Sequence, residues 1–488
     1  MSARTIELKH PNKLYIGGQW MEPSIPGVFE VLDCSTEEVA ARIARAGSAD
    51  VERAVTAARE AFDRGPWPRM SHAERGAILA RIADRFEALN DAFARIWAIE
   101  SGIVYKIAQP RLGFFLSAAF RQYAAMASTF PFTEPHKSAT GHEALLVQEP
   151  VGVVAAIVPW NGPAGLMAYK IAPALLAGCT VIVKSSPEAP CSAYLFAEMC
   201  EDLGLPPGVV NVITADRDVS EELVRHPGVD KITFTGSTGA GRRIGAVAAD
   251  RMARVTLELG GKSPAVVLDD YDVATAARTI GGSFFGYLSG QVCHSLTRII
   301  VPRARHDAMV EALANVARGM VLGDPFDPAT TAGPLATARQ REVVEHYVAK
   351  GIEEGATLAC GGRRPPQLER GFFYEPTVFG NVDNHCTIAR EEIFGPVLSV
   401  IPAESEDHAI ELANDTPFGL NAAVFTNDQG RALSVARRLR AGSVGHNASR
   451  TDFSIGFGGM KQSGIGREGG VGGLQAFLES KTIVLDKQ

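Results

Sequence analysis

Between residues 152 and 258 the sequence alternates apolar, strand-like runs with helical segments, and this alternation limits the possible folds more than any other feature. Four of the runs lie at 152–160, 180–184, 209–213 and 231–234. Strands and helices in this order favour a parallel sheet that is covered by helices on both faces. The sequence therefore predicts an α/β fold.

Several residues with ligand-binding character follow the ends of these strands. They are Trp160, Asn161, Lys184, Gly236, Ser237 and, at the end of V-T-L-E, Glu258. The ligand site of a parallel α/β sheet lies beyond the carboxyl ends of its strands. We therefore expect these residues to surround one site.

A second α/β unit is predicted after residue 293, because 488 residues are too many for one hydrophobic core. Its expected strands and helices lie at 298–301, 306–320, 339–351, 371–378, 391–400 and 407–413. Residues 456–473, which are dense in glycine, are expected to form loops, and residues 474–485 an edge strand.

Three helical patterns precede the alternating region. They cover 49–62, with Ser48 or Asp50 as the N-cap, 71–99 as a single helix, and 112–128. A short strand and hairpin are expected from Leu14 to Trp20. We expect these elements to be mainly scaffold.

Composition and charge exclude several classes of protein. The net charge is −7 with acidic and basic residues mixed, so no basic block predicts nucleic-acid binding. Seven cysteines without a C-x-x-C pair predict neither a disulfide framework nor a metal site, and favour a reducing compartment. Because the N-terminal M-S-A-R-T-I-E-L-K-H is charged and no apolar run reaches about 18 residues, we expect no membrane segment and a cytoplasmic protein.

A carboxylate and a thiol are the candidates for covalent chemistry. Cys293 stands in G-Q-V-C-H, and Glu258 ends a strand that should be buried. A cysteine attacks as the thiolate, so it needs a base or a setting that lowers its pKa. A free cysteine such as Cys293, considered alone, is more often a small buried apolar residue than a nucleophile. Burial of a lone carboxylate costs free energy, so a buried Glu258 is more indicative of a functional role.

The other motifs are ambiguous by themselves. The turn G-S-T-G-A-G (236–241) could hold a pyrophosphate on its backbone N–H groups, but it lacks the G-x-G-x-x-G pattern and is more often only a turn. Lys184 could bind ribose hydroxyls or reach solvent. Asn161 could cap the helix that begins at Pro163 or donate to an oxyanion.

The joint order of these motifs resembles the aldehyde dehydrogenase superfamily over nearly the whole chain. The matching segments are P-W-N (159–161), K-S-S-P-E (184–188), F-T-G-S-T (234–238), L-E-L-G-G-K-S (257–263), G-Q-V-C (290–293), E-E-I-F-G-P (391–396), N-D-T-P-F-G-L (414–420) and F-G-G-M-K-Q-S-G-I-G-R-E (457–468). The resemblance implies oxidation of an aldehyde to its carboxylic acid with a nicotinamide dinucleotide.

The resemblance also implies a role for each catalytic residue. Cys293 would attack the aldehyde, and Asn161 with the backbone N–H of the cysteine would hold the oxyanion. After hydride transfer, Glu258 would activate the water that hydrolyses the thioester. Lys170 would assist a proton relay.

The residues that would bind the cofactor come from both predicted units. They are Pro159, Trp160, Lys184, Glu188, Gly236, Ser237, Leu259, Gly260, Glu392 and Phe394. One departure concerns the glutamate that the family usually carries three residues after the ribose-binding lysine, because Pro187 stands there and Glu188 follows. The loss removes an acceptor for the adenosine ribose and a negative charge that would repel a 2′-phosphate. We still predict NAD as the cofactor and leave NADP open.

A second departure concerns the substrate channel, where Gly162 and Gly165 replace large side chains above Tyr169. The predicted pocket consists of Gly162, Gly165, Tyr169, Val292, His294 and Phe457. Its extra width predicts a bulky hydrophobic or aromatic aldehyde. Two alternatives remain: an acylating enzyme that uses coenzyme A, and a descendant of the fold that binds ligands without catalysis.

The resemblance further implies a division into domains and an assembly of subunits. Residues 1–128 and 149–259 would form the cofactor-binding domain, and 260–460 the catalytic domain. Residues 129–148 and 470–488 would form an oligomerisation hairpin and tail. We expect a homodimer or a homotetramer.

Overall fold

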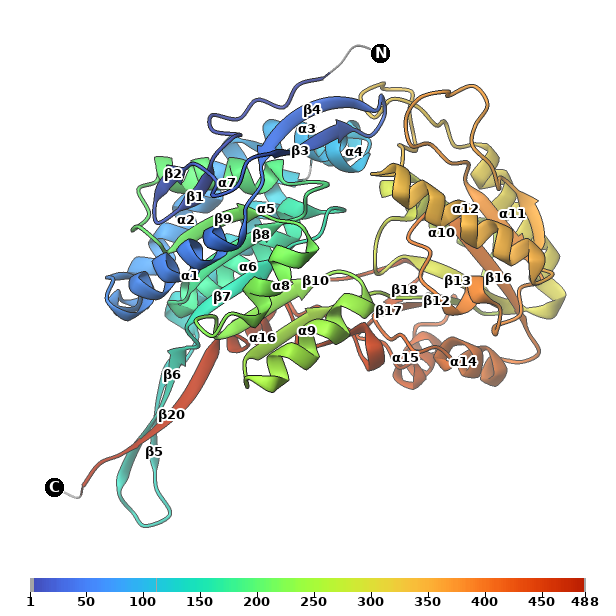
Figure 1. Ribbon diagram of the computed structural model, residues 1–488. Coiled ribbons are helices and arrows are strands. Elements are labelled where there is room, and N and C mark those ends of the chain that lie inside the picture. Colours follow the sequence, from blue (N-terminus) through green and yellow to red (C-terminus); the bar gives the residue numbers. More distant parts are fainter. Residues whose placement is uncertain (1–3, 111, 487–488) are drawn as a thin grey trace.

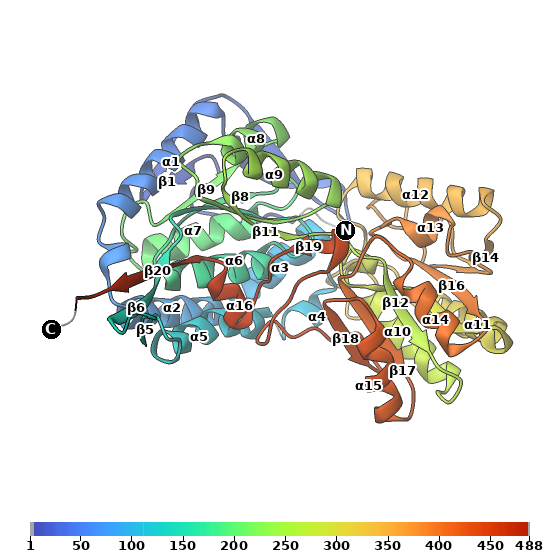
Figure 2. The same cartoon turned by 90° about the horizontal axis from the view of Figure 1, so that it is seen from below.

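Two sheets with their helices lie side by side in the computed structural model, which describes residues 4–110 and 112–486 (Figures 1 and 2). One sheet has eight strands and the other has seven. Residues 1–3 of the charged N-terminal stretch and residues 487–488 of the predicted tail lie outside the described residues. The α/β fold class is confirmed.

The eight-stranded sheet has the order β19-β11-β10-β7-β8-β9-β1-β2. Its strands are β1 (Leu14–Ile16), β2 (Gln19–Met21), β7 (Val153–Ile157), β8 (Thr180–Ser185), β9 (Val210–Thr214), β10 (Lys231–Thr235), β11 (Arg254–Glu258) and β19 (Gly464–Ile465). The five central strands are parallel, and β1, β2 and β19 are antiparallel to their neighbours. The carboxyl ends of the central strands therefore share one edge.

Helices bury both faces of this sheet, because alternate residues of each strand point to opposite sides. On β7, Val154 and Ala156 join one apolar cluster, and Val153 and Ala155 join the other. The helices of the first cluster are α2 (His72–Ala88), α3 (Asn90–Ser101), α5 (Leu112–Thr129), α6 (Pro163–Ala177) and α7 (Cys191–Asp202). Those of the second are α1 (Ser48–Asp63), α8 (Arg217–Arg225) and α9 (Thr238–Asp250).

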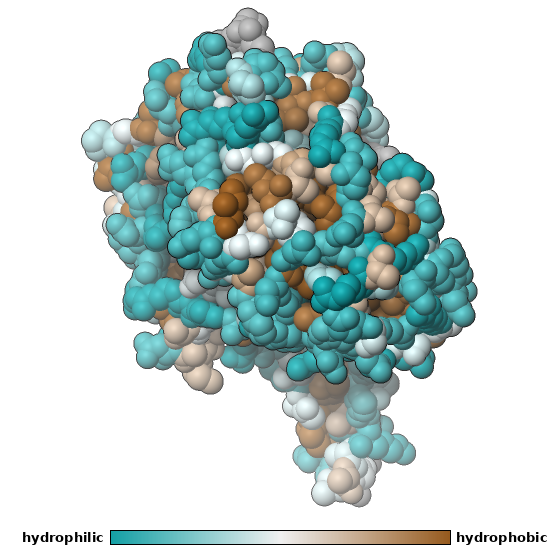
Figure 3. All heavy atoms as spheres, turned by 90° about the vertical axis from the view of Figure 1, so that its right-hand side faces the viewer, coloured by the Kyte–Doolittle hydropathy of each residue, from teal (hydrophilic) through white to brown (hydrophobic). Residues whose placement is uncertain are grey.

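The seven-stranded sheet has the order β14-β15-β16-β13-β12-β17-β18, with only β14 antiparallel among its described strands. The strands are β12 (Ser263–Val267), β13 (Leu296–Pro302), β14 (Thr357–Cys360), β15 (Thr377–Gly380), β16 (Val397–Ala403), β17 (Asn421–Phe425) and β18 (Ser443–His446). Its main helices are α10 (Val273–Gly286), α11 (His306–Arg318), α12 (Ala338–Glu353), α14 (Glu406–Asn414) and α15 (Gln429–Arg438). Figure 3 shows the molecule from this side, where hydrophilic residues surround an apolar patch.

An antiparallel arm projects away from both units (Figure 1). It consists of β5 (Thr133–Lys137), β6 (Glu143–Pro150) and β20 (Leu478–Val484), and β20 is an edge strand as predicted. Parts of the segments 129–148 and 470–486 thus meet in one sheet, although they lie far apart in the sequence.

The structure corrects two local predictions and adds one hairpin. The helix expected over 71–99 is interrupted at Leu89 and forms the two helices α2 and α3. At the start of α3, the side chain of Asn90 bonds to the backbone of Gln109 and Gly113. The N-cap of α1 is Gly47, since the Asp50 carboxylate accepts the N–H group of Gly47 at 2.8 Å. Two further elements were not predicted, the hairpin strands β3 (Val28–Asp33) and β4 (Glu38–Ala44).

Shorter elements also differ from the predictions. The strand expected at 371–378 covers only 377–380. The predicted loop at 456–473 contains β19 and the start of α16 (Gly470–Gln475), and α4 (Tyr105–Ala108) and α13 (Thr387–Arg390) are short helices between larger elements. No helix in the described part of the chain is long and apolar enough to cross a membrane.

Candidate active site

Two cavities meet at Cys293. One has a volume of about 310 Å³ and is mainly apolar, and the other has a volume of about 400 Å³ and follows the strand ends of the eight-stranded sheet. Asn161, Thr235 and Cys293 line both. A ligand in either cavity can therefore reach the thiol from its own side.

The loop before Cys293 has an unusual backbone. Leu288, Ser289 and Gly290 have φ angles of 54°, 50° and 75°, three consecutive residues in the left-handed region. The side chain of Gln291, which has no exposed surface, donates to the carbonyl of Leu288 at 2.8 Å and accepts from the N–H group of Ala336 at 2.9 Å. Such a conformation is costly and persists only when the surroundings hold it, as they do here.

The thiol of Cys293 lies in a setting that favours its neutral form. Burial raises its pKa above the ordinary value, and the nearby carboxyl groups of Glu392 and Glu258 raise it further. A higher pKa means less thiolate at neutral pH. A proton acceptor is therefore needed before the sulfur can attack.

Glu258 ends β11 and lines the same cavity as Cys293. Its side chain is 2% exposed, and neither carboxyl oxygen has a hydrogen-bond partner among the described residues. Burial raises the pKa of this carboxyl well above its ordinary value, and the charge of Glu468 adds to the effect. Gly458 passes so close that a Cβ there would lie 2.6 Å from Oε1, so the glycine-dense loop covers the carboxyl group.

Asn161 follows β7 and faces the cysteine loop. Its Nδ2 donates to the carbonyl oxygen of Gln291 at 2.9 Å. The N-cap of α6 is Gly162, and no side chain caps this helix. The alternative that Asn161 caps the helix is therefore wrong, and its amide is directed to the neighbourhood of Cys293.

Lys170 lies behind both cavities. Its fully buried ammonium donates to Thr235 Oγ1 at 2.6 Å and to the Glu468 carboxylate. Thr235 lines both cavities, so Lys170 reaches the site through this hydroxyl. Glu468 ends the motif 457–468, but its pairing with Lys170 was not predicted, because the two residues lie 298 positions apart.

The second cavity contains nearly all the residues predicted for cofactor binding. They are Pro159, Trp160, Glu188, Gly236, Ser237, Leu259, Gly260, Glu392 and Phe394. Lys184 is buried near this cavity without lining it, and burial lowers its pKa to about 8. The Glu392 carboxyl accepts the N–H group of Gly261 at 3.1 Å, and burial raises its pKa to about 7.

The turn 236–241 forms the N-terminus of α9. Ser237 is the N-cap, and its Oγ accepts the N–H group of Ala240 at 3.3 Å. Gly239 stands in open space, with no atom within 4 Å of an added Cβ. A helix N-terminus that opens into a cavity suits a pyrophosphate.

The apolar cavity contains all six residues predicted for the substrate pocket. They are Gly162, Gly165, Tyr169, Val292, His294 and Phe457. Burial lowers the pKa of His294 to about 4, so this imidazole is neutral near neutral pH. The phenyl rings of Phe453 and Phe457 stack at 4.4 Å, and Tyr169 lies 4.4 Å from Phe453.

Comparison with known proteins agrees with this geometry. The model of the aldehyde dehydrogenase family matches residues 20–483. The chain belongs to the aldehyde dehydrogenase family. The resemblance in the motifs is thereby confirmed, and the protein is an oxidoreductase that acts on aldehydes.

Individual relatives cover almost the full chain. Geranial dehydrogenase of Castellaniella defragrans is 42% identical over 99% of both chains. Betaine aldehyde dehydrogenase of Rhizobium leguminosarum is 40% identical over 96% of both. A crystal structure of an aldehyde dehydrogenase C mutant from Pseudomonas syringae with NAD+ and octanal is 39% identical over 99% of both chains, with a TM-score of 0.94.

Several residues of this family member were not identified from its sequence. In the second cavity they include Arg217, Arg339 and Gln340. The Gln340 amide donates to the carbonyl groups of Ile393 and Phe394, each at 2.9 Å. In the apolar cavity they include Trp97, Leu112, Phe115 and Phe453. They belong to helices and loops outside the motifs, so only the tertiary structure brings them to the site.

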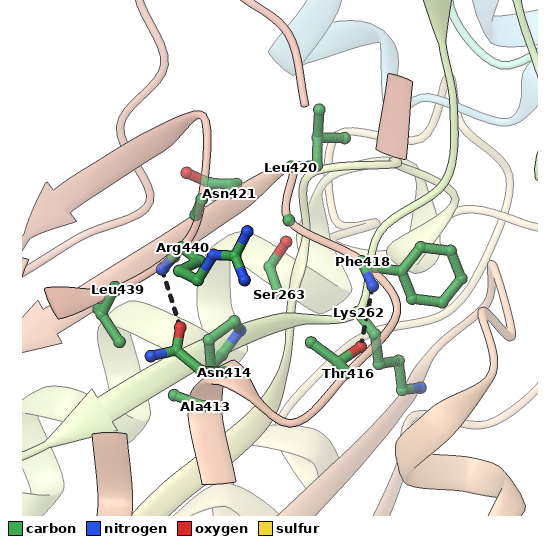
Figure 4. Close-up of a pocket in the computed structure, with 14 residues that line it drawn as sticks. Lys262, Ser263, Ala413, Asn414, Thr416, Phe418, Leu420, Asn421, Leu439 and Arg440 are labelled. Atoms are coloured by element: carbon green, nitrogen blue, oxygen red, sulfur yellow. Dashed lines mark hydrogen bonds between the residues drawn. The ribbon is translucent and has the colours of Figure 1, made fainter. Parts of the chain in front are cut away.

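A separate small hollow lies among residues of the catalytic unit that follow β11 (Figure 4). Its lining includes Lys262, Ser263, Asn421 and Arg440, and Asn421 Nδ2 donates to the carbonyl of His294 at 2.9 Å. Its volume is about 10 Å³, about the space for one water molecule. It is too small for an aldehyde or a dinucleotide.

Within 4–110 and 112–486, no cluster of three His, Cys, Asp or Glu side chains could hold a metal ion.

Proposed function

We propose that this family member oxidises a hydrophobic aldehyde to its carboxylic acid with NAD+. The observation that carries the proposal is the position of Cys293, where an uncharged aromatic cavity joins a cavity built on strand ends and a helix N-terminus. The first cavity has the character of a site for an apolar substrate. The second suits a dinucleotide.

The chemistry begins at the thiol. Its proton passes to Glu258, directly or through water, and Sγ of Cys293 attacks the carbonyl carbon. The resulting oxyanion accepts hydrogen bonds from Asn161 Nδ2 and from the backbone N–H group of Cys293. Because Asn161 already lies within reach of the cysteine loop, this donor needs little reorganisation.

Collapse of the oxyanion leaves a thioester on Cys293. When bound, NAD+ supplies the acceptor for the hydride that is released in this step. Glu258, after releasing the first proton to solvent, removes a proton from water, and the water oxygen attacks the thioester carbon. Collapse of the tetrahedral intermediate breaks the C–S bond and releases the acid, and the thiolate of Cys293 takes the proton back from Glu258. The high pKa of Glu258 makes its ionised form a strong base for this second task.

The residues of the second cavity fit NAD+. The N–H groups at the start of α9 would hold the pyrophosphate, and Glu392, with an oxygen not bonded to Gly261, would accept ribose hydroxyls. Phe394, in edge contact with Trp160 at 5.3 Å, would border the nicotinamide. Glu188 lines the cavity one position after Pro187 and supplies a negative charge, which supports NAD over NADP.

The aldehyde class follows from the lining of the first cavity. Its rings, its methyl groups and the neutral His294 offer no counter-charge to an ionic substrate. Gly162 leaves room, whereas Phe115 partly fills the space beside Gly165, where a Cβ would lie 3.1 Å from Phe115 Cε1. Relatives at similar sequence identity are named for different substrates, geranial and betaine aldehyde. The proposed substrate class therefore rests on the residues that line the cavity.

A panel of aldehydes tests the proposal, with NAD+ or NADP+ and NADH or NADPH formation followed at 340 nm. We expect kcat/KM to rise by roughly fourfold per added methylene while the chain remains inside the cavity, since burial of each methylene contributes about 0.8 kcal/mol. Equal values for acetaldehyde, octanal and betaine aldehyde would contradict the hydrophobic substrate. Formation of a thioester instead of an acid on addition of coenzyme A would favour the acylating alternative.

We also propose assembly into a homodimer or homotetramer through the arm of β5, β6 and β20. The arm projects from the molecule and leaves the outer edges of β5 and β20 unpaired with any other described strand. Exposed strand edges favour pairing with another chain. Sedimentation equilibrium of the full chain and of a Thr482→Pro variant would test whether this sheet holds the subunits together.

A further inference from the structure

We propose that Trp97 is a positioning residue for the oxyanion site. Its indole N–H group sets the orientation of the peptide that carries Asn161, and so the direction of the amide that faces Cys293. This inference rests on the proposed function. Trp97 then has two roles: it forms part of the wall of the aldehyde cavity, and it orients the Asn161 amide that stabilises the oxyanion.

Two side chains from the last turns of α3 donate hydrogen bonds to two consecutive backbone carbonyl groups in the loop after β7. Trp97 Nε1 donates to the carbonyl oxygen of Asn161 at 2.7 Å. Ser101, four residues later, donates from Oγ to the carbonyl oxygen of Trp160 at 2.6 Å. Residues four apart share one face of a helix. The helix therefore presents both donors to the loop together.

The side chain of Asn161 is anchored at its other end. Its Nδ2 donates to the carbonyl of Gln291, in the strained loop that precedes Cys293. Between these anchors the chain passes from β7 to Gly162, which has φ −148° and ψ 56° and no side-chain cap. No other side-chain hydrogen bond to the carbonyl of Asn161 is found among the described residues, so the indole alone fixes this peptide plane from the side of α3.

The indole of Trp97 also lines the aldehyde cavity and lies edge-on to Tyr287, with 6.0 Å between ring centroids. The simpler interpretation is that Trp97 is only a wall. A side chain that is only a wall contributes more binding free energy to a larger substrate, because the larger substrate makes more contact with the wall. A positioning residue acts on the oxyanion, which is the same for every aldehyde, so its effect is independent of substrate size.

The variant Trp97→Phe separates the two roles, because it keeps an aromatic wall and removes the N–H donor. Single-turnover NADH formation is measured with saturating acetaldehyde and with saturating octanal. We expect the rate to fall by roughly tenfold for both substrates, because a small misplacement of a catalytic group and an unpaired buried carbonyl both carry costs of this order. We also expect a larger kinetic isotope effect with aldehydes deuterated at the carbonyl carbon.

Ile107→Ala is the matched control, since Ile107 lines the same cavity without a side-chain hydrogen bond to the loop. It should raise KM for octanal more than for acetaldehyde, and any loss in the single-turnover rate should likewise be larger for octanal. If Trp97→Phe behaves like this control, with a larger effect for octanal than for acetaldehyde, the inference is wrong.

Ser101→Ala provides a second variant that does not touch the cavity. We expect a roughly threefold lower rate with both aldehydes, because the loop loses one of its two donors. This variant decides the question if Trp97→Phe does not fold, and unchanged rates in it would then overturn the inference. A wild-type protein that oxidises no aldehyde would contradict the proposed function itself, whereas an active wild type with unaffected variants contradicts only the role of Trp97.

Discussion

The two cavities that meet at Cys293 are built in different ways. The second cavity, proposed to bind the cofactor and called the cofactor cavity below, is formed largely by backbone and motif residues at strand ends, such as Gly236, Ser237 and Gly260. The aldehyde cavity is formed by side chains from α3, α5, α6 and the segment 453–457, among them Trp97, Phe115 and Phe453. A cavity made of backbone tolerates little change. One made of side chains can change its ligand while the fold is preserved.

A substitution at Cys293, where the two cavities meet, should have the largest effect and is the strongest test of this comparison. Cys293→Ala should abolish NADH formation, with a loss of at least about a thousandfold, because no other nucleophile replaces the thiol. Binding of NAD+, measured by quenching of protein fluorescence, should remain, since the backbone of the cofactor cavity is intact. Retained turnover in this variant would overturn the covalent mechanism.

Glu258→Gln should separate the two halves of the reaction. We expect a burst of about one NADH per active site followed by a steady rate lower by roughly a hundredfold or more, since water attack loses its base. The pKa of Glu258 is raised, so in the wild type the carboxyl is neutral at low pH and the steady rate should increase as the pH rises through this raised pKa. A steady rate that falls over the same range would contradict the role of Glu258.

Gly165→Leu should alter the aldehyde cavity alone. The added side chain meets Phe115, so we expect kcat/KM for a ring-bearing aldehyde to fall by roughly 10- to 100-fold, while acetaldehyde is little affected. The control is Gly282→Ala in α10, where an added Cβ meets no atom within 4 Å. An equal loss for both aldehydes would show that Gly165 does not determine substrate size.

Glu188→Gln should alter the cofactor cavity by the smallest amount. Glu188 is exposed, so removing its charge should improve kcat/KM with NADP+ by roughly three- to tenfold at low salt, and by less at high salt. The ratio of kcat/KM values for NADP+ and NAD+ measures the effect. No change in this ratio would mean that the charge of Glu188 does not face the cofactor.

The same contrast explains which predictions succeeded. Strand-forming runs alternate with helices over 152–258, and parallel strands place their carboxyl ends together, so the sequence was sufficient for the α/β fold. Nine of the ten residues predicted to bind the cofactor line the second cavity. It did not reveal the interruption of the helix at Leu89, because the apolar spacing continues through it. At the interruption the side chain of Asn90 bonds to the backbone of Gln109 and Gly113, and this contact is visible only in the tertiary structure.

The sequence by itself thus determined the family, the alternation of strands and helices over 152–258 and the candidates Cys293, Glu258 and Asn161, because these depend on local pattern and on motifs. Only the tertiary structure decided which side chains surround the aldehyde, how Lys170 pairs with Glu468, and that Trp97 holds the loop of Asn161. The physical reason is that side-chain packing and buried hydrogen bonds join residues that are distant in the chain. Their partners carry no local signature from which the contact could be predicted.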